Sequence, residues 1–213
     1  EAEASEDEGQ LVMNESIMKL FSNTHIEDGV KYITGDIARL GKDKSVFMVW
    51  NGFRVEKIIE LGVSKVNESV DVINNLASEY NVNRNNIIVD EDGVGGGVKD
   101  YLNCIGFVNN SKPIKIKGKE ENFSNLKSQC YYKLAEYLNR NEMYVDCDSK
   151  QEQLLSEELE MVRLAKETDA NKISLLSKDE IKKRIGRSPD YSDALMMRIY
   201  FELKSTGKYI FDY

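Results

Sequence analysis

The chain has 213 residues, of which 41% are hydrophobic and 31% charged, and its 29 basic and 37 acidic residues give a formal net charge of −8. This length suits one domain with a substantial core, and because no apolar run approaches the ~18 residues of a membrane span, we expect a soluble protein. The negative balance excludes nucleic-acid binding by bulk charge, so any such contact has to be local.

The N-terminal part of the chain is acidic at first and then shows the apolar spacing of a helix. We expect an extension or hinge over residues 1–28, one domain over 29–204 and a tail over 205–213. A first strand is predicted by VKYITGDIA, residues 30–38. The next segment, KSVFMVWNGFRVEKIIEL, holds two apolar runs around Asn51-Gly52, a pair typical of a two-residue type I′ hairpin. Three antiparallel strands are therefore predicted.

The remainder of the chain predicts crossover connections. Residues 64–80 have helical spacing and lead into a strand over 86–90. Helices and strands then alternate: a helix over 98–105, a strand over 112–118, a helix over 124–140, a strand over 142–147, a charged helix over 150–167, a strand over 171–177, a short basic helix and a last helix over 189–204. A meander followed by βαβ units predicts an α/β fold, with a mixed sheet flanked by helices.

Two of the predicted strands end in an aspartate. Asp36 lies near the end of the first strand and Asp90 at the end of the fourth. If these strands are parallel neighbours, the two carboxylates face each other across about 4.8 Å, where like charges repel by about 4 kcal/mol. Either a shared proton or a bound cation relieves this repulsion. Oxygen ligands without His or Cys favour Mg²⁺ or Mn²⁺.

A third acid comes from RSPDYSDALMMR, residues 187–198. Ser188 can cap the helix that follows, and Asp190 and Asp193 lie in its first turns, where capping is their simpler role. However, Asp193 precedes Met197 and Phe201 at intervals of four residues, so it lies on the stripe that faces the core. A carboxylate in that position needs a partner.

Divalent cations held by Asp36, Asp90 and Asp193 explain why acids and glycines share the loop DEDGVGGG. The acids alone repel a phosphate, whereas bound cations invert the local charge. In two-metal phosphodiester hydrolysis, ions about 3.5–4 Å apart activate a water and stabilise the leaving oxygen without a histidine base. Three further acids lie close by in the sequence, and each either binds a metal or is solvated or stabilises a turn. They are Asp43, Glu91 and Asp92.

Several other motifs have simpler explanations. The stretch GDIARLGKD lacks the spacing and the Ser or Thr of a Walker A motif, and GVGGGV lacks the third glycine of a dinucleotide fingerprint. Asp146 and Asp148 end a strand, but capping of the next helix accounts for them. Of Tyr131 and Tyr132, which could stack on bases, we expect at least one to lie in the core.

Four segments together resemble the nuclease domain of the large terminase subunit of tailed bacteriophages and related prophages. They are YITGDIARLGKDKSV, IIVDEDGVGGGVKDYL, NFSNLKSQCYYKLAEYL and RSPDYSDALMMR, which follow the family's order and cover most of residues 30–200. The resemblance implies a ribonuclease H-like fold and an endonuclease that uses two Mg²⁺ or Mn²⁺ ions to cut concatemeric viral DNA. It places the family's catalytic acids on Asp36, Asp90 and Asp193, with Asp190 as a further candidate metal ligand.

The resemblance also implies partners and a location. Double-stranded DNA is the implied substrate, and the implied partners are a packaging ATPase domain, expected outside this chain, a small terminase subunit and a portal. The implied location is the cytoplasm of a bacterial host, without a membrane, and we expect the isolated domain to be a monomer. Three cysteines without CxxC spacing and the single His25 support neither a disulfide framework nor a zinc site, which fits a reducing cytosol.

Two other functions stay open at the level of sequence. The acidic balance suits a non-catalytic ribonuclease H-like module that docks to DNA or to a protein, and metal binding with cleavage distinguishes the enzyme from it. An actin-like phosphotransferase is a further alternative, because GDIARLGKDKS precedes a hairpin that could hold ATP. ATP hydrolysis that survives loss of Asp193 would favour that reading. The basic clusters at 112–119 and 182–187 are either local DNA contacts or solvated faces.

Overall fold

A mixed sheet of six strands organises the protein, in a computed structural model that describes residues 9–38, 44–62, 66–94, 97–165 and 172–208. The strand order is β5-β4-β1-β2-β3-β6. The strands are β1 (Lys31–Asp36), β2 (Ser45–Asn51), β3 (Arg54–Leu61), β4 (Ile87–Asp90), β5 (Ile105–Phe107) and β6 (Tyr144–Val145). The three strands β1, β2 and β3 form an antiparallel meander, and β4, β5 and β6 join in parallel pairs. The predicted sheet is confirmed.

Asp43 lies outside the described residues, as do 1–8 and 209–213 of the predicted extension and tail.

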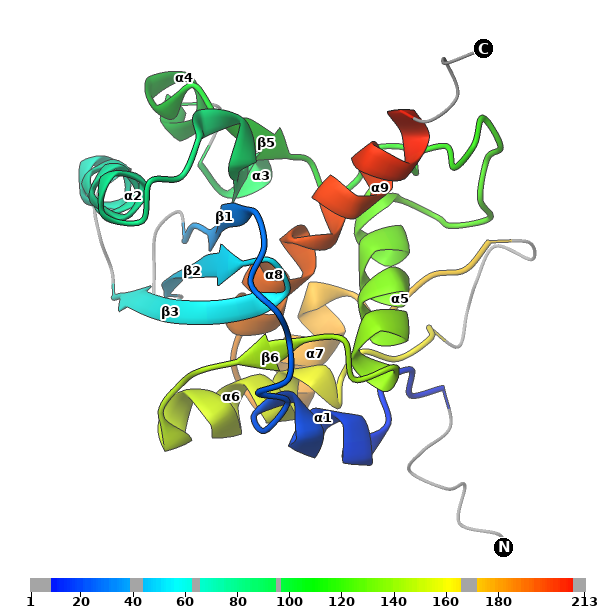
Figure 1. The fold of residues 1–213 in the computed structure, drawn as a ribbon. Coiled ribbons are helices and arrows are strands. Elements are labelled where there is room, and N and C mark those ends of the chain that lie inside the picture. The colour runs from blue at the N-terminus through cyan, green and yellow to red at the C-terminus, as the bar shows by residue number, and fades with distance from the viewer. Residues whose placement is uncertain (1–8, 39–43, 63–65, 95–96, 166–171, 209–213) are drawn as a thin grey trace, which may run out of the picture.

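Helices cover both faces of this sheet (Figure 1). Helix α2 packs against β1 and β2 on one face, and α8 packs against the same strands on the other. Helices α5, α6 and α9 then surround α8. The helices are α1 (Asn14–Leu20), α2 (Val66–Glu79), α3 (Glu91–Val94), α4 (Gly97–Leu102), α5 (Leu126–Asn139), α6 (Ser149–Leu159), α7 (Lys178–Ile185), α8 (Asp190–Met197) and α9 (Ile199–Lys208), with a 3₁₀ turn at Arg84–Asn86.

Strand β2 shows why the sheet needs two helical layers. All of its residues are buried, and their side chains alternate between two hydrophobic clusters. Phe47 and Val49 belong to the cluster under α2, whereas Val46, Met48 and Trp50 belong to the one under α5 and α8. Full burial of such a side chain contributes about 1.5–3 kcal/mol. A strand that is apolar on both faces is therefore stable only in the middle of the fold.

The β2–β3 hairpin turns one residue later than predicted. Asn51 pairs with Arg54, so the two turn residues are Gly52 and Phe53. Of these only Gly52 has a positive φ, at 64°, whereas a type I′ turn requires positive φ at both positions. A positive φ at the first position alone is the arrangement of a type II′ turn, for which glycine is the preferred residue. The expected type I′ turn is therefore wrong.

Two predicted strands are not strands in the structure. The strand beside β4 is β5, whose first residue, Ile105, was expected to end a helix. Residues 112–118 make only a bridge between Ile116 and Lys119, around a turn with positive φ at Lys117. Residues 172–177 likewise form only single bridges, one of them between Leu175 and Leu164. The bridges of both segments are to residues outside the six strands, so neither segment joins the sheet.

The last predicted helix is divided in two, and its second half extends past residue 204. Helix α8 ends at Met197 and α9 begins at Ile199. At the junction the guanidinium of Arg198 lies 4.0 Å from the ring centre of Tyr32 and 4.5 Å from that of Phe53. Its Nε also donates a 3.1 Å hydrogen bond to the carbonyl of Gly52. These contacts hold Arg198 at 2% exposure and fix the bend at that residue.

Helix α1 contributes to the main core. Its residues Ile17 and Leu20, and Val12 before it, are buried in the same cluster as α5 and α6. In addition, the side-chain amide of Asn139 in α5 donates a 2.8 Å hydrogen bond to the carbonyl of Leu11. The boundary drawn at residue 28 stays a prediction, but residues 9–20 pack as part of the domain.

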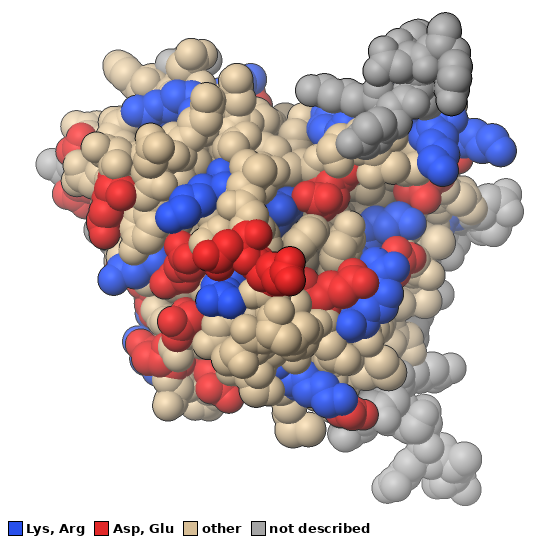
Figure 2. Space-filling view, in the orientation of Figure 1, with Lys and Arg blue, Asp and Glu red and all other residues tan. Residues whose placement is uncertain are grey.

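The surface carries the negative balance unevenly. Figure 2 shows Asp and Glu side chains gathered in a band across the middle of one face, with Lys and Arg side chains around it. A band of this sign repels a phosphate backbone, so this face does not suit DNA. In the described part of the chain, no helix has both the length and the apolar character needed to cross a membrane.

Candidate active site

Strand register directs Asp36 and Asp90 to the same face of the sheet. In the parallel pair β1–β4, Gly35 stands opposite Val89, so the next residues along the two strands, Asp36 and Asp90, are neighbours at the strand ends. Side chains alternate along a strand. Because Val89 points into the cluster under α2, Asp90 points the other way, toward α8. Asp36 shares that side with Thr34, whose hydroxyl accepts a 3.0 Å hydrogen bond from Trp50. Both aspartates are buried.

Helix α8 brings the remaining two acids to this place. It begins at Asp190 and packs against β1 and β2, and Asp190 and Asp193 are both buried. Ser188 was expected to cap the helix, but Pro189 occupies the cap position and the cap makes no side-chain hydrogen bond. The backbone N–H of Lys44 instead donates a 3.3 Å hydrogen bond to Oδ2 of Asp190. The loop before β2 thus helps to place α8.

Lys178, the first residue of α7, lies among these carboxylates. Its Nζ is 3.8 Å from Oδ2 of Asp36, 3.7 Å from Oδ1 of Asp190 and 3.6 Å from Oδ2 of Asp193. One ammonium therefore has three aspartates from two elements within 4 Å. Helix α7 is fixed in this position by a capping box between Ser177 and Glu180. Asp36, Asp190 and Asp193 therefore lie together around one lysine.

A second lysine and a tyrosine hold Asp193 from the side of α5. Nζ of Lys127 is 2.7 Å from Oδ1 of Asp193, and the hydroxyl of Tyr131 donates a 2.6 Å hydrogen bond to the same oxygen. The Tyr131 hydroxyl is also 2.9 Å from Oγ of Ser192. The expectation that at least one tyrosine of the pair lies in the core is confirmed, and its buried hydroxyl additionally orients an acid.

Asp90 has amide partners. Its Oδ1 accepts hydrogen bonds from the backbone N–H of Asp92, at 3.0 Å, and from Nδ2 of Asn109, at 3.3 Å. Asn109 also donates from its backbone and its side chain to Oδ2 of Asp92, at 2.8 and 2.9 Å. The carboxylate of Glu91 faces away and pairs with Lys99 at 3.3 Å. Among the described residues, Asp92 and Glu91 thus have structural partners of their own.

The acids differ in how readily they ionise. Burial raises the pKa of Asp36 well above its usual range, and the charges of Asp193, Asp190 and Asp90 add to this effect, while Lys178 opposes it. Burial likewise raises the pKa of Asp90. Burial acts in the same direction on Asp193, but Lys127, Lys178 and the Tyr131 hydroxyl outweigh it and lower its pKa. Two effects therefore reduce the repulsion among these carboxylates. Two lysines compensate their negative charge, and Asp36 tends to bind a proton.

A buried glutamate of α6, Glu158, binds the first turn of α8. Oε2 of Glu158, at the end of α6, accepts a 2.7 Å hydrogen bond from the backbone N–H of Ser192. Its other oxygen pairs with Arg187, which also donates a 2.8 Å hydrogen bond to the carbonyl of Leu154. Burial raises the pKa of Glu158 to about 8, against the effects of the Ser192 N–H and Arg187. This network ties the first turn of α8 to α6.

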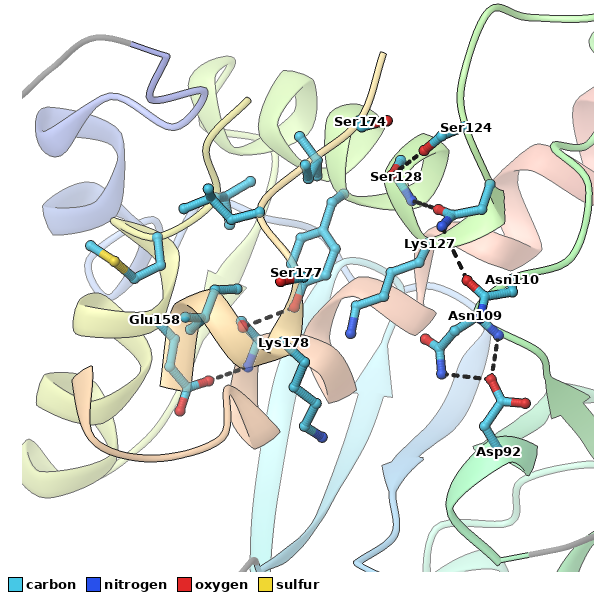
Figure 3. A pocket seen from close by; sticks show the side chains of 18 residues that line it. Asp92, Asn109, Asn110, Ser124, Lys127, Ser128, Glu158, Ser174, Ser177 and Lys178 are labelled. Atoms are coloured by element: carbon cyan, nitrogen blue, oxygen red, sulfur yellow. Dashed lines mark hydrogen bonds between the residues drawn. The ribbon is translucent and has the colours of Figure 1, made fainter. Parts of the chain in front are cut away.

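A cavity of about 500 Å³ opens beside the acids (Figure 3). Lys127 and Lys178 extend into it from α5 and α7, and Asn109 and Asp92 border it on the side of β5. None of the four aspartates lines the cavity, but both lysines that line it also pair with Asp193. A ligand in the cavity would therefore contact the lysines that hold this carboxylate.

The donor set fits hard divalent cations. All four predicted ligands, Asp36, Asp90, Asp190 and Asp193, are carboxylates, and oxygen ligands of this kind select Mg²⁺ or Mn²⁺. As the side chains stand, no group of three or more His, Cys, Asp or Glu among the described residues is arranged to hold one ion. The ammonium of Lys178 lies among three of these carboxylates, within 4 Å of each. A metal would thus replace one positive charge with another.

The residues that the sequence did not reveal are the partners of the acids. Lys127, Tyr131, Asn109 and Lys178 were not assigned to the site. Only Lys178 had a local signal, since S-x-x-E at 177–180 marks a helix start that places the lysine in its first turn. The others reach the acids through contacts between distant segments, which no local pattern encodes.

Comparison with known proteins identifies the fold. No protein-family model matches the chain, and no curated protein matches its sequence. The nuclease domain of the large terminase subunit gp2 of bacterial virus Sf6 superposes with a TM-score of 0.77 at 22% identity, covering 89% of this chain and 97% of that one. The large terminase nuclease from thermophilic phage G20c gives 0.60 at 16% identity, covering 90% and 98%. The Thermus phage P74-26 large terminase nuclease domain gives 0.56 at 15%, covering 95% and 100%.

These structural neighbours are nuclease domains of phage large terminase subunits, so the ribonuclease H-like fold that the sequence segments implied is confirmed. The Sf6 domain has been solved with manganese and beta-thujaplicinol, and the G20c nuclease with bound magnesium or cobalt. At 15–22% identity, the likeness establishes the fold of this chain.

Proposed function

We propose that this chain is the metal-dependent endonuclease domain of a phage-type terminase large subunit, and that it cuts concatemeric double-stranded DNA by phosphodiester hydrolysis. The observation that carries the proposal is the convergence of Asp36, Asp190 and Asp193 on the ammonium of Lys178, at the strand end that also bears Asp90. Buried carboxylates cost free energy unless a cation compensates them. A site that retains several of them is built for positive charge.

In this proposal Asp36, Asp90 and Asp193 would hold two Mg²⁺ or Mn²⁺ ions, with Asp190 as a supporting ligand. When bound, the ions would supply a nucleophilic water at neutral pH and stabilise charge on the leaving oxygen. The chain's own residues orient the acids: Tyr131 and Lys127 hold Asp193, and Asn109 holds Asp90. Carboxylates fixed in this way lose little conformational freedom when they bind an ion.

Lys178 is the cation of the metal-free site. Its three carboxylate contacts, at 3.6–3.8 Å, are longer than close ion pairs, and its side chain is 41% exposed. It can therefore swing toward solvent, or toward a DNA phosphate, when divalent ions compensate the acids. The proposal thus assigns Lys178 two roles, compensating charge without metal and contacting the substrate with it.

By the same proposal the partners are double-stranded DNA, a packaging ATPase domain, a small terminase subunit and a portal, in the cytoplasm of a bacterial host. The contact with DNA is confined to the side of the acid cluster, because the face in Figure 2 carries an acidic band. We therefore expect the domain alone to bind DNA weakly and with modest sequence preference.

Incubation of supercoiled plasmid with the protein tests the proposal. We expect nicking and linearisation with Mn²⁺ or Mg²⁺, no cleavage with EDTA, and loss of cleavage in Asp90→Ala. Asp71→Ala is the matched control, since Asp71 is an exposed aspartate of α2 on the opposite face of the sheet. Full cleavage by Asp90→Ala would refute the proposed site. Metal-independent DNA or protein binding without any cleavage would instead support a non-catalytic docking module.

A further inference from the structure

The cavity beside the acids has two chemically different walls. One is apolar and comes from the segments that flank α7 and follow α6; it includes Met161, Leu175 and Leu176. The other is polar and comes from the loop after β5 and the start of α5; it includes Asn110 and Ser128. At about 500 Å³ the cavity falls in the size range of pockets for small ligands.

Both walls are held by backbone hydrogen bonds. In the apolar wall, the N–H of Leu176 donates to the carbonyl of Arg163 at 3.0 Å, and that of Ala165 donates to Ser174 at 2.9 Å. In the polar wall, the N–H of Leu126 donates to the carbonyl of Ser111 at 2.8 Å. Segments far apart in the chain are thus tied in pairs, so the cavity is a preformed site.

The polar wall offers an exposed side-chain amide, that of Asn110. Oδ1 of Asn110 accepts a 3.3 Å hydrogen bond from Asn125, but within the described residues the Nδ2 of Asn110 has no acceptor. Side-chain amides of this kind pair with the edges of nucleobases. An apolar wall suits the face of a base, because an extruded base is held by packing between aromatic or apolar side chains and by hydrogen bonds to its edge.

Positive charge lies where the two walls meet the acid cluster. Lys127 and Lys178 both line the cavity, and the N-terminus of α5, whose dipole favours anions, opens beside Lys127. A ligand with a planar heterocycle between the walls would place an attached phosphate at these ammoniums. Asp193 lies next to both ammoniums, 2.7 Å from Nζ of Lys127 and 3.6 Å from Nζ of Lys178.

From this arrangement we propose that the cavity is a nucleotide-binding subsite, which accepts one unstacked nucleotide of the DNA strand next to the phosphate that is cut. The face of the base packs on Met161, its edge pairs with Asn110, and its phosphate lies at Lys127. This inference rests on the proposed nuclease function for its setting. The subsite has one consequence for the DNA: the bases of the cut strand are unstacked at the cleavage position. A duplex bound on a flat surface would keep them stacked.

Direct binding of deoxyadenosine 5′-monophosphate to the full chain tests the subsite. Calorimetric titration in EDTA makes the readout independent of metal and of cleavage. We expect saturable binding by the wild type. Met161→Trp, which fills the apolar side, should weaken it by at least about tenfold. Leu164→Trp is the matched control, because Leu164 lies on the same segment but does not line the cavity; its affinity should equal that of the wild type.

A second variant covers the case in which Met161→Trp does not fold. Asn110→Asp keeps the oxygen that accepts from Asn125 but adds a negative charge and removes the unused donor, so the affinity should also fall. Inorganic phosphate tests the anionic end alone and should compete weakly. Absence of saturable nucleotide binding by the wild type, unchanged affinity in Asn110→Asp, or full competition by phosphate at equal concentration would overturn the subsite.

A parallel plasmid assay separates this inference from the proposed function. A wild type that nicks plasmid but does not bind the nucleotide overturns the subsite and leaves the nuclease intact. Conversely, nucleotide binding that Met161→Trp or Asn110→Asp weakens, in a protein that cuts no DNA under any metal condition, supports the subsite and refutes the nuclease.

Discussion

The ammonium of Lys178 lies 3.6 Å from Oδ2 of Asp193, while the ammonium of Lys127 lies 2.7 Å from Oδ1 of the same carboxylate. Asp193 is thus paired on both of its oxygens by lysines from two different helices. This double pairing explains why the pKa of Asp193 is lowered although the residue is buried. If divalent ions bind these carboxylates as proposed, their binding is coupled to the position of Lys178, because both depend on the same side chains.

The first prediction concerns metal binding without catalysis. Mn²⁺ at about a hundred times its dissociation constant should stabilise the native state by about 2.7 kcal/mol, which raises the melting temperature of a domain of this size by about 5–10 °C. Asp36→Asn should lose this shift, because it removes a buried carboxylate of the cluster. Differential scanning fluorimetry measures both, with Asp71→Asn as control. An equal shift in Asp36→Asn would contradict a shared site.

The second prediction concerns Lys178→Ala. Without metal, loss of the ammonium leaves three carboxylates with less compensation, so the melting temperature in EDTA should fall and the pKa of Asp36 should rise further. With Mn²⁺ the shift should exceed that of the wild type, because the ion no longer has to displace an ammonium. Lys183→Ala, at an exposed position of the same helix, should behave like the wild type. A smaller shift in Lys178→Ala would mean that the lysine assists metal binding.

The third prediction concerns Tyr131→Phe. This change removes hydroxyl contacts with Asp193 and Ser192 but keeps the ring. A hydrogen bond to a charged group contributes about 1.5–3 kcal/mol, so the free energy of unfolding should fall by about that amount, and cleavage should slow because Asp193 loses an orienting contact. Urea denaturation and plasmid nicking measure the two effects.

Tyr132→Phe is the control for that experiment. The hydroxyl of Tyr132 makes no hydrogen bond within the described residues, and its ring packs on Phe123. It should therefore leave both stability and cleavage unchanged. If the two variants lose cleavage equally, the loss reflects disturbed packing of α5, and the assigned role of Tyr131 is wrong.

The acids could be predicted from the sequence because each lies near the end or the start of a strand or helix, and the local residue pattern marks that boundary. Asp36 and Asp90 end apolar runs, and Asp193 shares an apolar stripe with Met197 in a helix that begins after a proline. Once β1 and β4 are parallel neighbours, strand alternation fixes the direction of the first two. The fold class follows from the same signals, because a meander and crossover units leave few possible topologies.

The lysines were not accessible in this way. Lys127 lies in the first turn of α5 and Lys178 in that of α7, positions where a lysine is ordinarily solvated. Their role arises only in the folded protein, where both ammoniums reach carboxylates of α8. The shifted hairpin turn and the bend at Arg198 have a similar origin: the Arg198 guanidinium contacts both Phe53 and the carbonyl of Gly52. Tertiary contacts of this kind override local propensity.

The last prediction concerns pH and Glu158, whose pKa burial raises to about 8 in the folded protein from 4.5. Between these values the folded state binds more protons than the unfolded state, so stability contributed by this group is present below pH 4.5 and is lost as the pH rises through about 8. The melting temperature of the wild type should therefore fall more steeply between pH 5 and about 8 than that of Glu158→Gln.

The comparison of slopes isolates this one group, because Asp36 and Asp90, whose pKa values are also raised, are present in both proteins. Absolute stabilities will differ, since glutamine still accepts from the Ser192 N–H but leaves Arg187 with only one charged partner in α6, Glu157 at 3.0 Å. Thermal unfolding followed by circular dichroism across this pH range measures the slopes. Parallel curves would show that Glu158 is ionised throughout, as its pairing with Arg187 favours, and that burial does not control its titration.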